Sequence, residues 1–424
     1  MDEKKDSGVD WLGKIPAHWN LTKISMVYDE RRTKVSDKNF MPLSVTKNGI
    51  VPQLESAAKT DNGDNRKLIL KGDFVINSRS DRRGSCGISQ YDGSCSLINT
   101  VLISRQEMCN GFYSFVFKTE PFADEFYKWG HGIVDDLWST KWSDMKHIKI
   151  PLPPLEEQKK IAAYLDRKCS AIDSAVDAAK KMVETLSGYK KSLITEIVTK
   201  GLNPAAKMIA GGVGWIGKIP AHWKISKLKY VCKIFGRIGF RGYTQSDLVD
   251  KGEGAITLSP SNITDEGMSY KKCSFLSWKK YEESPEIKIY DGDILMVKTG
   301  SSYGKSCLVT NLPLKSTINP QLLVIKEILS DNKFLSYVMK TTMIKTQIEV
   351  SVVGGAIPTI SQEKIRNFQF PLPPIDEQKK IADYLDRKCS AIDENISVHK
   401  NLSEKLSEYK KSLIYEVVTG KISV

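Results

Sequence analysis

The stretch closest to a catalytic motif is GSSYGKS at residues 300–306. A phosphate-binding loop needs four residues between its glycines, then Lys and Ser or Thr, with a helix behind them to hold the phosphate. Here three residues separate the glycines, Thr299 stands where the first glycine belongs, and the following CLVTNLP predicts a strand. The pattern therefore argues against a nucleotide-binding loop.

Carboxylates suggest a second catalytic interpretation, a metal-dependent nuclease. Asp291 and Asp293 flank a glycine, and an E-x-K pattern runs from Glu286 to Lys288. Paired carboxylates can hold a catalytic metal ion, but the first half of the chain has no equivalent E-x-K, and a turn explains D-G-D better. The chain also lacks a nucleophile motif and the Asn/Asp-Pro-Pro-aromatic motif of amino-methyltransferases. We expect no active site, no metal and no cofactor.

Composition favours a polyanionic partner. The 63 Lys and Arg residues exceed the 50 Asp and Glu residues, which gives a formal net charge of +13, and such a balance most often indicates nucleic acid. No apolar run approaches the length of a membrane span, and the polar, acidic start MDEKKDSGVDW is unlike a signal peptide. The eight cysteines form no CxxC pair, so we expect a reducing cytoplasm.

One long segment occurs twice. PLPPLEEQKKIAAYLDRKCSAID at 151–173 returns as PLPPIDEQKKIADYLDRKCSAID at 371–393, and YKKSLI at 189–194 returns at 409–414. In each copy prolines precede the predicted helix, acidic residues fill its first turn, and a glycine, Gly201 or Gly420, closes it. Each of these features is typical of a helix terminus. The sequence predicts two long helices.

Apolar residues recur every seven residues in both copies, as in a coiled-coil seam. The alternative is an amphipathic helix packed on its own domain, but about 45 helical residues span roughly 65 Å, more than the width of a small domain. The second seam is more polar in its middle, at His399 and Ser403. The residues predicted to pair the helices are Leu165, Ile172, Val176, Val183, Leu186, Leu193, Leu385, Ile392, Ile396, Leu406 and Leu413.

A second repeated segment opens each half of the chain. WLGKIPAHWNLTKIS at 11–25 returns as WIGKIPAHWKISKLK at 215–229, an offset of 204 residues, whereas the long helices are offset by 220. Gly72 and Gly84 already match Gly292 and Gly304 at the larger offset, so the second half carries 16 extra residues that fall between positions equivalent to about 24 and 71. A repeat this long indicates a duplicated domain. A structural role is favoured for His18 and His222, which lie between Ala and Trp in this segment.

The segments between the repeats are strand-rich. KLILKGDFVINS at 67–78 and IKIYDGDILMVK at 287–298 predict strand–turn–strand units, and shorter helices are predicted near 112–128 and 333–348. The mixture predicts an α+β fold made of two duplicated mixed α/β domains. The predicted boundaries are 1–150 for the first domain, 151–203 for the first helix, 204–370 for the second domain and 371–424 for the second helix.

Basic loops in the two domains are candidate DNA contacts. Arg and Lys neutralise phosphates or bond to guanine, while Ser and Tyr bond to bases and to the sugar-phosphate backbone. A solvated surface charge is the alternative for each of them. The candidates are Arg31, Arg32, Arg79, Arg82, Arg83 and Lys141 in the first half, and Arg237, Arg241, Tyr243, Lys298, Ser301, Tyr303 and Lys305 in the second.

The repeated motifs resemble those of the specificity subunit of type I restriction-modification systems. The resemblance rests on W-x-G-x-I-P-x-H-W at 11–19 and 215–223 and on L-P-P-[LI]-x-E-Q-K-K-I-A-x-Y-L-D at 152–166 and 372–386. It implies two target recognition domains, each reading half of a split DNA sequence, joined by two long helices that pair antiparallel with pseudo-two-fold symmetry. It also implies a non-catalytic chain that sets the half-site spacing and docks modification subunits, two in number, with ATP-dependent restriction subunits joining through the complex.

Three hypotheses follow from the sequence. The first is a DNA-binding specificity module. The second is a stand-alone metal-dependent nuclease or NTPase built on Asp291, Asp293 or the GKS sequence, and DNA cleavage with magnesium and ATP would separate the two. The third is a coiled-coil scaffold without DNA binding. Binding to duplex DNA in preference to a charge-matched polyanion would exclude it.

Overall fold

The computed structural model describes residues 3–53, 63–79, 82–133, 138–237, 239, 242–265, 267–351 and 358–424. The chain divides into two compact units. Unit 1 comprises residues 1–179 and 401–424, and unit 2 comprises residues 180–400. No helix among the described residues is long and apolar enough to cross a membrane.

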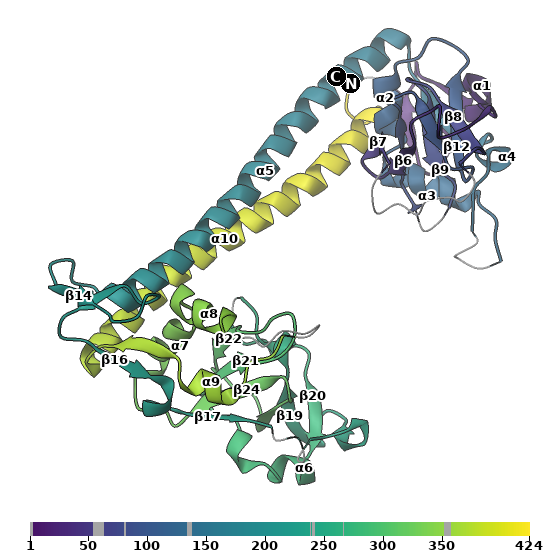
Figure 1. The fold of residues 1–424 in the computed structure, drawn as a ribbon. Helices are drawn as coiled ribbons and strands as arrows, with labels where there is room; N and C mark the ends of the chain where they lie inside the picture. Colours follow the sequence, from purple (N-terminus) through teal and green to yellow (C-terminus); the bar gives the residue numbers. More distant parts are fainter. Residues whose placement is uncertain are drawn as a thin grey trace. The chain divides into compact units, whose positions relative to one another are not determined.

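The two long helices are present as predicted (Figure 1). Helix α5 covers Leu155–Lys200, helix α10 covers Ile375–Val418, and both are led by the Pro-Pro sequence. The glycines that follow have positive φ angles, +75° at Gly201 and +70° at Gly420. A residue without a Cβ adopts this left-handed conformation at little cost, so these glycines end the helices.

Within each unit, part of α5 packs against part of α10. In unit 1, Leu165, Ile172 and Val176 share a core with Leu413 and Val417. Since the first half of α5 meets the second half of α10 here, and the reverse holds in unit 2, the helices run antiparallel. The corresponding residues of unit 2 include Leu193, Ile194, Val198, Leu385, Cys389 and Ile392.

Lys190 and Lys410 lie in the helix seam, seven residues after Val183 and Ser403, and two equivalent ion pairs explain their presence there. Lys410 Nζ lies 2.6 and 2.7 Å from the carboxylate oxygens of Asp173 in unit 1. Lys190 Nζ lies 2.6 and 2.7 Å from those of Asp393 in unit 2. Each pair is the other shifted by 220 residues, so the duplication preserved the helix contact together with the helix sequence.

The repeated W-x-G-K-I-P-x-H-W segment supplies one strand of a hairpin, and it contacts a terminus of each long helix. In unit 1, Trp19 Nε1 and His18 Nε2 both bond to the carboxylate of Glu157 in the first turn of α5, each at 2.9 Å. Tyr415 of α10 donates a hydrogen bond to the carbonyl of Trp11. In unit 2, His222 and Trp223 bond to Glu377 in the same way. The hairpin strands are β1 (Lys4–Asp6) with β2 (Lys14–Pro16), and β14 (Met208–Ala210) with β15 (Lys218–Pro220).

The main sheet of unit 1 has the strand order β10-β9-β12-β4, with antiparallel neighbours. Helices α2 (Asn110–Val116) and α3 (Glu120–Lys128) supply Phe112, Tyr113 and Phe122 to a core that also holds Tyr28 and Phe74 of this sheet. This core contains seam residues of α5, so the sheet is anchored on the long helices. The strands are β4 (Tyr28–Glu30), β9 (Phe74–Asn77), β10 (Cys86–Ile88) and β12 (Asn99–Ser104).

Smaller elements complete unit 1. A second sheet has the order β11-β8-β5, the hairpin β6–β7 lies beside it, and the pair β3–β13 joins the segment after Trp19 to the segment before α5. The elements are β3 (Asn20–Lys23), α1 (Ile24–Val27), β5 (Lys34–Val35), β6 (Leu43–Thr46), β7 (Gly49–Pro52), β8 (Arg66–Ile69), β11 (Gly93–Cys95), α4 (Trp142–Met145) and β13 (Lys149–Leu152).

Unit 2 repeats the main sheet as β22-β21-β24-β17 and the closing pair as β16–β25. Its helices α7 (Asn332–Met339) and α8 (Thr342–Glu349) correspond to α2 and α3. The remaining elements of this frame are β16 (Lys224–Lys227), η3 (Leu228–Tyr230), β17 (Lys233–Gly236), β21 (Ile294–Val297), β22 (Ser306–Leu308), β24 (Leu322–Lys326), α9 (Gln362–Arg366) and β25 (Gln369–Leu372).

The second sheet is where the units differ most. In unit 2 it has four strands, β18-β20-β19-β23, and its β19–β23 pair is parallel. This sheet shares a core with the main sheet, in which Leu258, Ile289 and Ile318 pack with Leu295 and Val324. Its elements are η5 (Gln245–Asp247), β18 (Leu248–Val249), β19 (Gly254–Leu258), η6 (Pro260–Asn262), β20 (Ser274–Ser277), α6 (Trp278–Glu282), η7 (Pro285–Ile287) and β23 (Ser316–Ile318).

The predicted fold class is confirmed: two mixed α/β regions are carried by two long helices that pack together. How the two units are placed relative to one another, including the expected pseudo-two-fold symmetry, stays a prediction.

Candidate nucleic-acid interface

The basic loop of unit 1 leaves strand β9 and returns as β10. Arg79 forms a β-bridge with Ser139, and Thr140 N donates to Ser78 O at 2.9 Å, so the loop is held beside the segment that leads to Lys141 and α4. Arg79, Arg82, Arg83 and Lys141, which the sequence singled out separately, therefore lie on neighbouring segments. All four side chains are exposed.

Arg83 is oriented by two partners. It is ion-paired with Asp124, and its guanidinium lies 5.2 Å from the centre of the Tyr127 ring. Both partners lie on α3, and nothing in the sequence pattern pointed to them. The side chain of Arg83 is still 47% exposed, so part of it remains accessible to a ligand.

Unit 2 builds its basic loop at the equivalent place, between β21 and β22. Thr299 forms a β-bridge with Thr359, and Ile360 N donates to Lys298 O at 3.0 Å. These contacts are those of Arg79 and Ser139 shifted by 220 residues. The structure thus brings together Lys298, Ser301, Tyr303 and Lys305, although the sequence gave no sign that residue 359 lies beside them.

The unit 2 loop differs from the unit 1 loop in chemistry. Lys305 Nζ lies 2.8 Å from Asp265, and the position equivalent to Lys305 in unit 1 is Ser85. Partial burial lowers the pKa of Lys298, whose unit 1 equivalent is Ser78. The two loops lie on equivalent scaffolds but carry different side chains, so they are suited to bind two different ligand surfaces.

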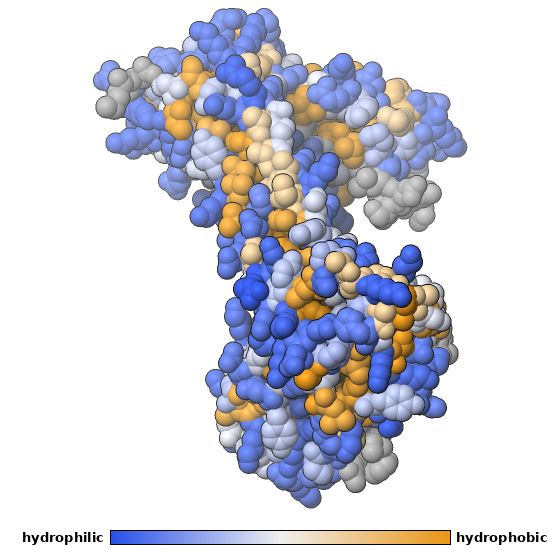
Figure 2. All heavy atoms as spheres, turned by 90° about the vertical axis from the view of Figure 1, so that its left-hand side faces the viewer, coloured by the Kyte–Doolittle hydropathy of each residue, from blue (hydrophilic) through white to orange (hydrophobic). Residues whose placement is uncertain are grey.

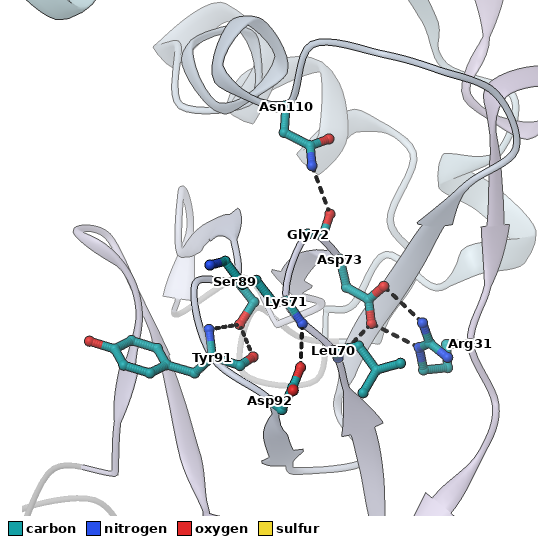
Figure 3. Close-up of polar contacts among 9 residues, drawn as sticks. All are labelled: Arg31, Leu70, Lys71, Gly72, Asp73, Ser89, Tyr91, Asp92 and Asn110. Atoms are coloured by element: carbon teal, nitrogen blue, oxygen red, sulfur yellow. Dashed lines mark hydrogen bonds and ion pairs between the residues drawn. The ribbon is translucent and has the colours of Figure 1, made fainter.

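Two of the arginine candidates turn inward. Arg31 donates to both carboxylate oxygens of Asp73, at 2.8 and 2.9 Å, and Asp73 also accepts from Leu70 N at 2.8 Å (Figure 3). The Arg31 side chain is only 15% exposed. Arg31 therefore braces the turn between β8 and β9, whose Gly72 carbonyl accepts from Asn110 at the start of α2.

Arg237 is the topological equivalent of Arg31, because each follows the edge strand of its main sheet, β17 or β4. It is 5% exposed, and it donates to Ile318 O and to Thr317 Oγ1, each at 3.1 Å. Burial lowers its pKa. The Arg237 guanidinium also lies 5.2 Å from the centre of the Tyr243 ring, so this arginine joins two parts of unit 2.

The remaining candidates lie at the edges of these regions. Arg32 is 77% exposed and is ion-paired with Glu30. Tyr243 is half-buried beneath Arg237. Arg241 lies outside the described residues.

A protein-family model described as the type I restriction modification DNA specificity domain matches residues 32–175 and, separately, residues 220–408. The chain belongs to this family. It is a DNA specificity subunit of a type I restriction-modification system, a non-catalytic role. The sequence-based interpretation of fold and function is confirmed.

Curated specificity subunits resemble this specificity subunit over most of its length. The putative MjaX specificity subunit of Methanocaldococcus jannaschii is 25% identical over 439 residues, which cover 97% of this chain and 96% of that protein. The MjaVIII specificity subunit of the same organism is 28% identical over 286 residues, which cover 66% of this chain and 63% of that protein.

Solved structures share the fold of this specificity subunit. A chain from a study of complex assembly and conformational transition in the type I R-M system matches with a TM-score of 0.74 at 16% identity, over 96% of this chain and 99% of that chain. The HsdS subunit from Thermoanaerobacter tengcongensis matches with a TM-score of 0.55 at 18% identity, over 96% and 98% of the two chains.

The carboxylates of the nuclease hypothesis have structural roles in this specificity subunit. Asp293 accepts a hydrogen bond from Tyr290 N at 2.9 Å, and Asp291 accepts from Leu312 N at 3.0 Å, as expected for a turn. The GKS sequence leads into strand β22, as predicted, and not into a helix. Within the described part of the chain, no group of three or more His, Cys, Asp or Glu side chains could hold a metal ion.

Proposed function

We propose that each unit reads one half of a bipartite DNA target, with residues 1–150 and 204–370 as the two target recognition domains. The observation that carries the proposal is that the family model matches the two halves separately, at 32–175 and 220–408. The two basic loops support it, since they occupy equivalent places and carry different side chains. Two homologous recognition domains would then recognise two different short DNA sequences.

The proposed DNA contacts are the candidates whose side chains are exposed or partly exposed and are not held in the interior. In unit 1 these are Arg32, Arg79, Arg82, Arg83 and Lys141, and in unit 2 they are Lys298, Ser301, Tyr303 and Lys305. Arg31 and Arg237 have internal roles instead, because their donors are used by Asp73 and by the strand β23. Flexible lysines and arginines at such positions neutralise phosphates, and some of them bond to base edges.

We further propose that the helices at 151–203 and 371–424 set the half-site spacing and dock two modification subunits. The helices keep apolar side chains exposed at equivalent positions, Met182 and Tyr189 in α5 and Leu402 and Tyr409 in α10. Figure 2 shows hydrophobic residues at the surface along these helices. Restriction subunits would join through the complex, and eight free cysteines suit the cytoplasm.

Methylation mapping of two triple variants tests the two-reader proposal. In the complex with modification subunits, replacing Arg79, Arg82 and Arg83 by Ala should relax the sequence preference at one half-site only. Replacing Lys298, Tyr303 and Lys305 by Ala should relax the preference at the other. A variant that altered both half-sites equally would contradict the proposal that each unit reads its own half.

Heptad insertion tests the proposed spacing role. Seven residues added after Val183 and seven after Ser403 keep the seam in phase and lengthen the pair by about 10 Å. The unspecified gap between the half-sites should grow by at most about three base pairs, with both specified blocks unchanged. An active variant with an unchanged gap would show that these helices do not set the spacing.

A further inference from the structure

Unit 2 contains a cleft of about 840 Å³ that is lined by its strand-rich part and by its portions of α5 and α10. The cleft lies outside the set of residues that the sequence assigned to DNA contact, except at Tyr303 and Lys305. We call it the lysine cleft after the six lysines that line it: Lys190, Lys191, Lys305, Lys340, Lys345 and Lys400.

Half of these lysines have a carboxylate partner. Lys190 is bound to Asp393, Lys305 to Asp265 and, at 3.7 Å, Lys345 to Glu349. The fourth carboxylate of the cleft, Asp386, is bound to Lys333 and to the hydroxyl of Tyr337, each at 2.7 Å.

The other three, Lys191, Lys340 and Lys400, make no ion pair with any residue that the structure describes, and all three are exposed. The cleft therefore holds three uncompensated positive charges.

Unit 1 neutralises the equivalent of Lys191. That residue is Lys411, 220 positions later, and its Nζ lies 2.6 Å from the carboxylate of Glu120, the first residue of α3. In unit 2 the first residue of α8 is Thr342, which bonds instead to Thr195 of α5. A carboxylate stands at this helix N-terminus in unit 1 alone, so Lys411 has an ion pair and Lys191 has none among the described residues.

Two of the uncompensated lysines, Lys191 and Lys400, lie near Asp265, the ion-pair partner of Lys305 in the 298–305 loop. The pKa of Asp265 is lowered chiefly by its hydrogen bond to Lys305, and the charges of Lys400 and Lys191 act in the same direction. Asp265 and Lys305 both line the cleft. Lys191 and Lys400 of the helices therefore line one cleft together with Lys305, a residue of the loop proposed to contact DNA.

We propose that the lysine cleft of unit 2 binds phosphate groups of the DNA backbone beside the half-site that unit 2 reads, and that unit 1 has no matching contact. The proposal rests on the proposed function. Lysine is a flexible point charge, whereas bidentate recognition of one phosphate would favour arginine. Several separated lysines along a cleft suit successive backbone phosphates, which carry no sequence information.

Salt dependence of binding tests the proposal. The double variant Lys191→Met and Lys400→Met keeps the apolar stems of two exposed side chains, so it should fold. In the complex with modification subunits, the slope of log K against log salt should fall by about two, with sequence preference retained at both half-sites. The matched control, Lys180→Met with Lys411→Met, changes the two equivalent residues 220 positions away and should leave the slope unchanged.

An unchanged slope in the Lys191 and Lys400 variant would overturn the inference and leave the proposed function standing. Absence of sequence preference in the wild-type complex would overturn the proposed function. The salt slope of the Lys191 and Lys400 variant would still decide whether the lysine cleft binds phosphates. Lysine acetylation footprinting of the wild-type chain needs no variant. Target duplex should protect Lys191, Lys340 and Lys400, whereas protection by ATP or inorganic phosphate but not by DNA would assign the cleft to a free phosphate ligand and overturn the proposal.

Discussion

The Gly-Asp turn occurs once in each unit, and its aspartate is neutralised in only one of them. In unit 1, Asp73 is held by Arg31 as a buried ion pair. In unit 2, Asp293 accepts from Tyr290 N and forms no ion pair with a described residue, and burial raises its pKa. The two units keep the same frame and differ in where charge is compensated. In the lysine cleft, unit 2 again lacks a counter-charge that unit 1 supplies, and there the charge left without a partner is positive.

The largest effect is expected at Asp73. Asp73→Asn leaves the guanidinium of Arg31 buried without its counter-charge, which should cost about 3–5 kcal/mol of stability in unit 1. Asp293→Asn in unit 2 keeps an oxygen for Tyr290 N–H and should change stability by less than about 1 kcal/mol. Denaturant unfolding with hydrogen exchange in residues 66–77 and 287–297 measures both.

The pH dependence of stability in unit 2 provides a control for the comparison of Asp73→Asn with Asp293→Asn. Because the folded pKa of Asp293 is raised, its contribution to stability is fully present below the unfolded pKa and is lost as pH rises through the folded value. Asp293→Asn should remove that dependence, so the variant should gain stability relative to the wild type as pH rises from the acid range. Equal losses from the two Asn variants at pH 7 would contradict the comparison.

The two helix-ending glycines should also differ. An alanine Cβ at Gly420 would lie 2.2 Å from Pro16 Cδ, whereas at Gly201 the nearest atom, in the Trp223 ring, is 3.0 Å away. Both substitutions place a Cβ in the left-handed region, at about 1 kcal/mol, but Gly420→Ala adds an overlap worth about 1–3 kcal/mol. Thermal unfolding should rank Gly420→Ala as the more damaging, and a reversed order would contradict these contacts.

Weakening the contacts between hairpin and helix should lower stability equally in the two units. Glu157→Gln and Glu377→Gln each weaken a bond to a nearly buried tryptophan, Trp19 or Trp223, and to the neighbouring histidine. We expect a loss of about 1 kcal/mol in each case, read as faster hydrogen exchange at the start of α5 or α10. A clear difference between the two variants would show that the hairpins are not equivalent.

The sequence predicted what depends on local pattern and missed what depends on distant partners. The two long helices, their closing glycines and the strand–turn–strand units followed from periodicity and from Gly and Pro positions over short windows. The inward orientation of the Arg31 side chain could not be predicted in this way, because its partner Asp73 is 42 residues away in the sequence. The residues next to Arg31 in the chain do not distinguish it from an exposed arginine. The lysine cleft draws on α5, α8 and α10, and only the folded chain shows that Lys191, Lys340 and Lys400 line one space.

The smallest effect is expected at the two seam lysines. Lys190→Met and Lys410→Met remove ion pairs that are partly exposed, with the Asp393 and Asp173 side chains 42% and 56% exposed, and such pairs contribute about 0.2–1 kcal/mol. Methionine adds apolar surface to a largely hydrophobic seam, which offsets part of that loss. Both variants should therefore stay within about 0.5 kcal/mol of the wild type in thermal unfolding. A loss above about 2 kcal/mol in one unit alone would mean that the duplicated ion pair has acquired a different role there.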